Sequence, residues 1–176
     1  YLDYLDDQHA FVSALPQTIR QNLTVRLFPN DYGWDQHNRW RDHFPDLALD
    51  DGHSRLNDLI RQSRVYIATY NATTFLESFT MDVPTIIFWN SNHWELRESA
   101  LPYFEDLKRV GIFHETPESA AQHINLVWND VNNWWHSKEV QKAREKFCDQ
   151  YANTSNDIFG KIIHILQQDN LNGETL

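Results

Sequence analysis

The sequence predicts an α/β domain: a Rossmann-like parallel sheet of about five to six strands, with helices on both faces and a helical carboxyl-terminal extension. The spacing of apolar residues alternates along the chain between a period of about two, typical of strands, and about 3.6, typical of helices. Repeated strand–helix units of this kind form parallel sheets. The chain has 176 residues, 41% of them hydrophobic, which is enough for a core of its own.

Each expected strand is short, apolar and followed by turn-forming or polar residues. The strands are expected at about 23–28, 47–49, 65–69, 84–88 and 112–114. Helices are expected at 4–15, 35–44, 94–109, 138–152 and 156–168, and three more are expected to open near 54, just after 71–73 and at 116. Ser54 and Thr116 are the expected amino-terminal caps of two of these helices, the second strengthened by Pro117 at the first helical position.

Composition excludes several classes of protein. Fifteen Lys and Arg against 25 Asp and Glu give a net charge of −10 at pH 7, which argues against a nucleic-acid binder. The one cysteine, Cys148, excludes an internal disulfide framework and a cysteine-based zinc site, and favours a reducing, cytoplasmic setting. The apolar run at 86–89 is far shorter than the ~20 residues that a membrane span needs, so no transmembrane segment is expected.

The organisation expected is one domain over residues 1–168 and a polar tail over residues 169–176. The chain starts at Tyr1 rather than methionine, from which we expect a piece of a longer protein. The sequence contains neither the glycine-rich dinucleotide fingerprint nor a P-loop. None of the nine histidines belongs to a recognisable metal-ligand spacing, so no metal and no cofactor are expected.

The first candidate site follows the third expected strand, because ligands bind beyond the carboxyl ends of parallel strands. Asn71, Thr73 and Thr74 lie in a polar turn that leads into a helix, where hydroxyls and free amide groups can bind an anion. Glu77 lies one turn further and could accept two hydroxyl hydrogen bonds, as from a ribose. The alternative is a capping box, with Thr73 or Thr74 as cap and Glu77 bonding back to it.

The second candidate is Arg26, in the first expected strand. An arginine near the carboxyl edge of a sheet can hold a phosphate through two parallel hydrogen bonds. The alternative is an edge-strand arginine that is paired with a carboxylate.

The third candidate is the polar segment after the fourth expected strand, which begins with Asn90, Ser91 and Asn92 and runs to Arg97. Its Glu95 and Arg97 could contact a sugar or a base. The alternative is the capped start of a surface helix.

Four segments together resemble a family of bacterial surface-carbohydrate transferases. They are RLFPNDYGW, SRVYIATYNATTFLESFTMDVPTIIFWN, LPYFEDLKRVGIFHETPESAA and DVNNWWHSKEVQKAREKFCDQYA. The family looks like GT-B-type glycosyltransferases that are distantly similar to the Kdo transferases of capsule and lipopolysaccharide synthesis. The resemblance covers roughly residues 4–165 and only the carboxyl-terminal half of such an enzyme, which is the nucleotide-sugar donor domain and half of a GT-B fold.

The resemblance implies a role for each candidate. Thr73 and Thr74, beside Asn71, would hold the donor phosphates and Glu77 the ribose, while Arg26 would stabilise the leaving group. Residues 90–92 would border the base or sugar. The general base, and so the catalytic residue proper, would come from an amino-terminal domain of the same protein.

The implied partners are a nucleotide-sugar donor, with a CMP-linked acidic sugar favoured by analogy, and a carbohydrate or glycolipid acceptor. The implied location is the cytoplasm, including the inner face of the plasma membrane. Two other functions stay open: a non-catalytic Rossmann-like nucleotide-binding or scaffold module, and a polyol-phosphate transferase domain.

Overall fold

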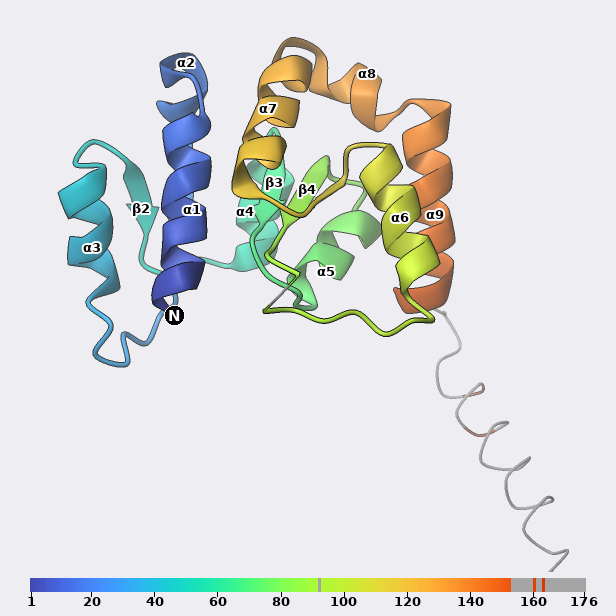
Figure 1. Cartoon of the computed structure of the whole chain (residues 1–176), viewed down its shortest axis with the longest axis horizontal. Helices are drawn as coiled ribbons and strands as arrows, with labels where there is room; N and C mark the ends of the chain where they lie inside the picture. The colour runs from blue at the N-terminus through green and yellow to red at the C-terminus, as the bar shows by residue number, and fades with distance from the viewer. Residues whose placement is uncertain (92, 153–159, 161–162, 164–176) are drawn as a thin grey trace, which may run out of the picture.

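The computed structural model describes residues 1–91, 93–152, 160 and 163 (Figure 1). Its strands are β1 (Thr24–Arg26), β2 (Ala48–Asp50), β3 (Tyr66–Ala68), β4 (Thr85–Phe88) and β5 (Phe113–His114). Its helices are α1 (Leu2–Ala14), α2 (Gln17–Arg20), α3 (Gln36–His43), α4 (Leu56–Gln62), α5 (Thr74–Thr80), α6 (Leu101–Arg109), α7 (Pro117–Val127), η1 (Trp128–Asp130), α8 (Val131–Trp135) and α9 (Lys138–Tyr151).

The expected α/β class is confirmed, and all five expected strands form. All the strand pairs are parallel, but the hydrogen bonds divide the strands into two sheets, β1-β2 and β3-β4-β5, instead of one layer of five to six strands. The strands have only two to four residues each, so the hydrogen-bonded ladders are short. The register that aligns Ala68 with Ile87 places the segments after β3 and β4 side by side.

Two apolar clusters hold the helices on the strands. One joins α1 and α7 to both sheets, and Phe11 of α1 stacks on Phe88 of β4 with ring centroids 5.0 Å apart. The other joins α5, α6 and α9 to β3, β4 and β5 around the fully buried Trp135 and Phe79. Figure 1 shows α1 and α7 neighbouring each other and α9 running along the outside of α6.

The helix boundaries depart from the expectations at three places. The helix expected at 94–109 begins only at Leu101, next to Pro102, because residues 93–100 form turns and irregular backbone. Ser54 does not cap α4; its hydroxyl donates to Asp50 instead. The short helices α2 and α8 and the 3₁₀ turn η1 were not expected.

The remaining expected helices are either confirmed or lie mostly outside the described residues. Thr116 caps α7 by accepting from the amide of Ser119, with Pro117 at the first position as expected. Helix α9 forms over almost the expected range. Most of the helix expected at 156–168, and the tail at 169–176, lie outside the described residues. Among the residues that the structure describes, no helix is both long and apolar enough to cross a bilayer.

Candidate functional site

The segment from Asn71 to Glu77 follows β3 at the carboxyl edge of the three-stranded sheet. Helix α5 is held on the sheet by the buried rings of Phe75 and Phe79. The buried hydroxyls of Ser78 on α5 and Thr85 on β4 also lie 2.9 Å apart and are hydrogen-bonded. These contacts fix the start of α5 beside the end of β3. The expected placement of Thr73 and Thr74 at the helix start is therefore what the structure shows.

The capping box, which was the alternative to an anion-binding site at this helix start, is not formed. Thr73 is the N-cap residue of α5, yet its side chain makes no capping hydrogen bond. The carbonyl of Thr73 accepts from Leu76 and Glu77. In the described part of the chain, no hydrogen bond uses the amide groups of Thr74 and Phe75, which leaves two donors at the sheet edge. Because α5 has only seven residues, its dipole is small, and an anion here would be bound mainly by these amide donors and the nearby hydroxyls.

Glu77 is exposed on the first turn of α5. Within the described residues, its carboxylate forms no hydrogen bond or ion pair, unlike the carboxylates of Asp50, Asp82 and Asp106. A carboxylate in this state can accept hydrogen bonds from two neighbouring hydroxyls of a ligand.

The phenol of Tyr66, on β3, is affected by three of the candidate residues, although Tyr66 was not itself a candidate from the sequence. Burial raises the pKa of its phenol. A side-chain hydrogen bond with Thr74 and the positive charge of Arg26 lower the same pKa, while the negative charge of Glu77 raises it. Of the three, Thr74 bonds the phenol, and Arg26 and Glu77 act on it through their charges. The only sequence signal for Tyr66 was a hydroxyl-bearing ring on a strand that leads into the polar turn.

Arg26, the last residue of β1, forms the ion pair that was the alternative to a ligand role. Its Nη1 donates to Asp50 Oδ2 at 2.6 Å, and Asp50 is its register partner on β2. Its Nη2 donates to the carbonyls of Gly52 at 2.6 Å and Ser54 at 2.9 Å. The guanidinium thus fastens the loop after β2, and its terminal nitrogens are not free to form a two-pronged phosphate clamp in this arrangement.

The third candidate segment lies in the loop after β4. Asn90 is half-buried and its carbonyl accepts from the amides of His93 and Trp94 at 3.0 and 3.2 Å, which closes a turn. Ser91 is exposed and Asn92 lies outside the described residues. Because β3 and β4 are neighbours, this turn and the segment from Asn71 to Glu77 share one edge of the sheet.

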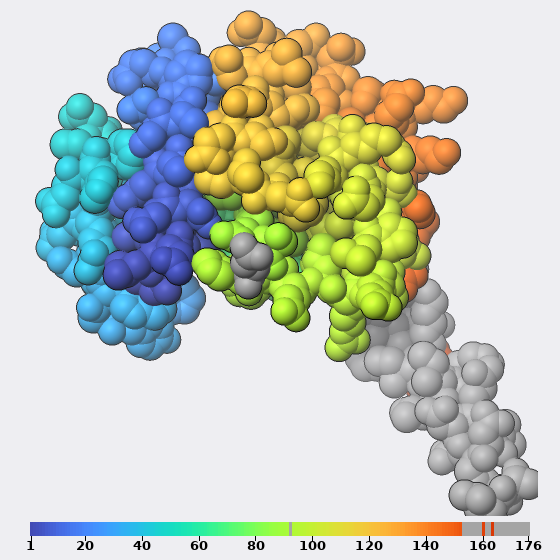
Figure 2. All heavy atoms as spheres, in the orientation of Figure 1, coloured from blue at the N-terminus to red at the C-terminus, as the bar shows by residue number. Residues whose placement is uncertain are grey.

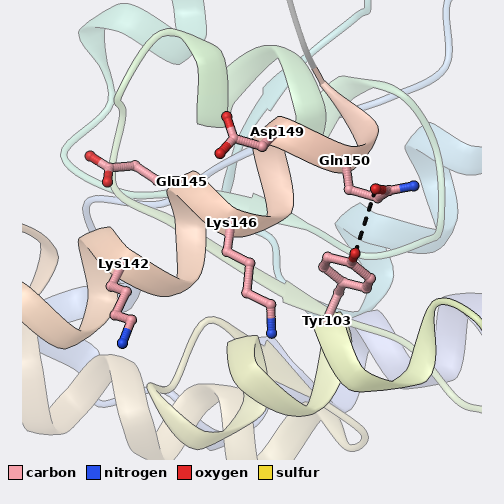
Figure 3. A pocket seen from close by; sticks show the side chains of 6 residues that line it. All are labelled: Tyr103, Lys142, Glu145, Lys146, Asp149 and Gln150. Carbon is pink, nitrogen blue, oxygen red and sulfur yellow. Dashed lines mark hydrogen bonds between the residues drawn. The ribbon is translucent and has the colours of Figure 1, made fainter.

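Two hollows lie away from this edge segment. One, of about 410 Å³, lies between α6 and α9 and is lined by Tyr103 and charged side chains of α9 (Figure 3). Lys146 there already pairs with Asp106 at 2.6 Å. The other, of about 350 Å³, lies beside β5 between the end of α6 and α7. Neither hollow is lined by any candidate residue that the structure describes.

The second hollow contains a hydrogen-bonded histidine. The Nε2 of His114 faces the carbonyl of Gly111 at 3.0 Å, so it carries the proton, and its Nδ1 accepts from the hydroxyl of Ser119 at 2.8 Å. Burial lowers the pKa of His114 and of the neighbouring His123, the latter to about 4. Both imidazoles are therefore neutral near pH 7, and they support β5 and α7 as uncharged packing groups.

Comparison with known proteins gives one finding. Residues 1–166 match the model of a family described as the LIC12162 family transferase. Neither the curated proteins nor the solved structures contain a match to the chain. The match spans the strands, helices α1 to α9 and every candidate residue described above. The chain therefore belongs to the LIC12162 family of transferases.

Proposed function

We propose that this chain is the nucleotide-sugar donor-binding domain of a GT-B-type glycosyltransferase that acts in bacterial cell-surface polysaccharide synthesis, in capsule or O-antigen. A transferase moves a group from a donor to an acceptor, and the family match supports that general activity. The donor role is supported by one observation above all. The segment from Asn71 to Glu77 presents two amides and a carboxylate that have no partner among the described residues, at the carboxyl edge of a parallel sheet.

The chemistry of this segment matches the two parts of a nucleotide that do not vary with the base. Amide groups and threonine hydroxyls donate to phosphate oxygens, and a carboxylate accepts from the ribose hydroxyls. We assign the phosphates to Thr73 and Thr74, beside Asn71, and the ribose to Glu77. In a transfer reaction the same donors would stabilise the charge that develops on the leaving phosphate.

We assign Arg26 an electrostatic role: its positive charge favours the leaving phosphate without contacting it. Its guanidinium is held by Asp50 and by two carbonyls, and its charge nevertheless acts on Tyr66, next to Thr74.

We assign Asn90 and Ser91 to the border of the base or sugar. The acceptor is a carbohydrate or glycolipid, the location is the cytoplasm, and the general base comes from an amino-terminal domain, so the chain alone binds nucleotide without turnover.

The test is a thermal-shift and calorimetric titration with CMP, CDP, UDP and GDP. A ligand that binds the folded chain raises its melting temperature as the ligand concentration rises. Glu77→Ala is expected to weaken the binding of the best nucleotide about tenfold, because a charged acceptor of two hydroxyl hydrogen bonds is lost. The ligand-free melting temperature is expected to stay close to that of the wild type.

Glu118→Ala is the matched control, since Glu118 is also an exposed acid in the first turn of a helix, α7. It is expected to leave nucleotide affinity unchanged. A flat response to all four nucleotides would contradict the proposal and favour the non-catalytic module. Equal losses of affinity in the two variants would contradict the assignment of the ribose to Glu77.

A further inference from the structure

Exposed aromatic rings gather at the carboxyl edge of the strands. In the described part of the chain, seven aromatic residues are exposed, and six of them lie in the loops after β1, β3 and β4 or at the start of α1. They are Tyr1, Phe28, Tyr32, Trp34, Tyr70 and Trp94, and the seventh is Tyr151 at the end of α9. Exposed rings concentrated at the ligand-binding edge of a sheet indicate a function for them, because rings scattered at random would not favour this edge.

Two of these rings flank the segment assigned to the phosphates and ribose. Tyr70 directly precedes Asn71, and the turn is tight because the amide of Ala72 donates to the carbonyl of Tyr70 at 3.0 Å. Trp94 lies in the neighbouring loop after β4, and its ring centroid is 6.1 Å from that of Tyr70. Each of the two side chains is 37% exposed.

The ring of Tyr70 is held in place by a residue of α1. It packs edge-on against Tyr4 of α1, with centroids 6.0 Å apart and planes at 87°. The hydroxyl of Tyr4 is in turn hydrogen-bonded to Thr69 at 2.7 Å, and Gln8 donates to the same threonine at 2.8 Å. Figure 2 shows the start of α1, in dark blue, beside the light-green segment after β4, where His93 and Asp3 approach to 3.8 Å. The ring of Tyr70 is therefore held in position without a ligand.

We propose that Tyr70 and Trp94 form the stacking surface for the nucleobase of the donor. This inference rests on the proposed function, because the phosphates and ribose at Thr73, Thr74 and Glu77 would bring the base to these rings. A planar base stacks on an aromatic face whatever its hydrogen-bonding pattern.

A second group of exposed aromatic rings at the carboxyl edge of the strands provides the control substitutions. Phe28, Tyr32 and Trp34 pack on one another in the loop after β1, with centroids 5.8 and 5.5 Å apart, and Tyr1 stacks on Trp34 at 4.5 Å. All four rings are more exposed than those of Tyr70 and Trp94, and three of them lie in the loop after a strand of the other sheet. Substitutions there remove equal aromatic area without touching the proposed base surface.

The experiment measures by calorimetry the affinities of CMP, UMP, GMP, AMP and ribose 5-phosphate for wild type, Tyr70→Leu, Trp94→Leu, Trp94→Phe and Tyr32→Leu. The wild type is expected to bind its preferred nucleotide more tightly than ribose 5-phosphate. Trp94→Leu and Tyr70→Leu are expected to weaken that nucleotide about tenfold, the usual size of a lost base–aromatic stack, and to leave ribose 5-phosphate unchanged. Trp94→Phe should restore most of the affinity, and Tyr32→Leu should have no effect.

The outcomes separate this inference from the proposed function. If the nucleotide binds and both leucine variants, folded by their ligand-free melting curves, keep wild-type affinity, the stacking surface is wrong and the donor site stands. If only Tyr32→Leu loses affinity, the base lies on the other aromatic group and the inference is also wrong. If neither nucleotides nor ribose 5-phosphate bind the wild type, the proposed function fails together with the inference.

Discussion

Replacing Arg26 by methionine is expected to destabilise the fold by about 2 kcal/mol. Arg26 makes three hydrogen bonds, to Asp50 and to the carbonyls of Gly52 and Ser54. The side chain of Asp50 is only 11% exposed and would lose its cationic partner. Breaking a fully buried ion pair costs about 3–5 kcal/mol. The side chain of Arg26 is 28% exposed, so water can replace part of what is lost, and about half of that cost remains.

Urea denaturation followed by circular dichroism measures this loss, and a melting curve should show a decrease of about 4–8 °C. The double variant Arg26→Met with Asp50→Asn is expected to lose less than the sum of the two single variants, because each single change leaves the other group unpaired. Arg26→Lys should recover little, since one ammonium group cannot span three acceptors. A loss below about 0.5 kcal/mol for Arg26→Met, the size of an ordinary surface substitution, would refute the argument that this side chain fastens the loop.

Three further predictions concern the rest of the fold. Burial, followed by the charge of His114, lowers the pKa of His123 to about 4, so the unfolded chain binds the extra proton as pH falls from 6.5 to 4. The free energy of unfolding of the wild type should therefore fall by about 1–2 kcal/mol between pH 6.5 and 4, a figure reduced because solvent reaches part of the ring. The same fall in pH should cost the His123→Gln variant less. Gly111→Ala should cost about 2 kcal/mol, because φ is +80° and a Cβ atom would meet the ring of His123; an unchanged melting curve would contradict this. Thr116→Ala should cost about 1 kcal/mol and Thr73→Ala almost nothing, because only the first threonine caps its helix; equal losses in urea denaturation would contradict the difference.

Local signals predicted the elements well. The five strands were predictable because short apolar runs between turns have few other uses in a chain of this composition. Thr116 and Pro117 marked the start of α7 correctly, because the residues that satisfy a helix start are adjacent in sequence. The division into two sheets was not predictable, since it depends on how strands that are far apart in sequence meet.

Long-range contacts explain where the sequence analysis failed. Ser54 has the chemistry of a cap, but Asp50 accepts its hydroxyl hydrogen bond, and Asp50 is placed by its pairing with Arg26. Which alternative applied to Arg26 could not be decided from residues 20–30, because its partners lie about 25 residues further on. Thr73 and Thr74 were placed correctly at the start of a helix, but the contact of Thr74 with Tyr66 depends on the packing of α5 against β3.

The central claim is that the start of α5 binds a nucleotide, and amide chemical shifts test it most directly. In an assigned ¹H–¹⁵N spectrum, addition of the best-bound nucleotide is predicted to shift the amides of Thr74 and Phe75 most. These amides have no hydrogen-bond acceptor among the described residues. Shifts centred on the groove between Tyr103 and Lys146, or no shifts at saturating nucleotide, would contradict the claim.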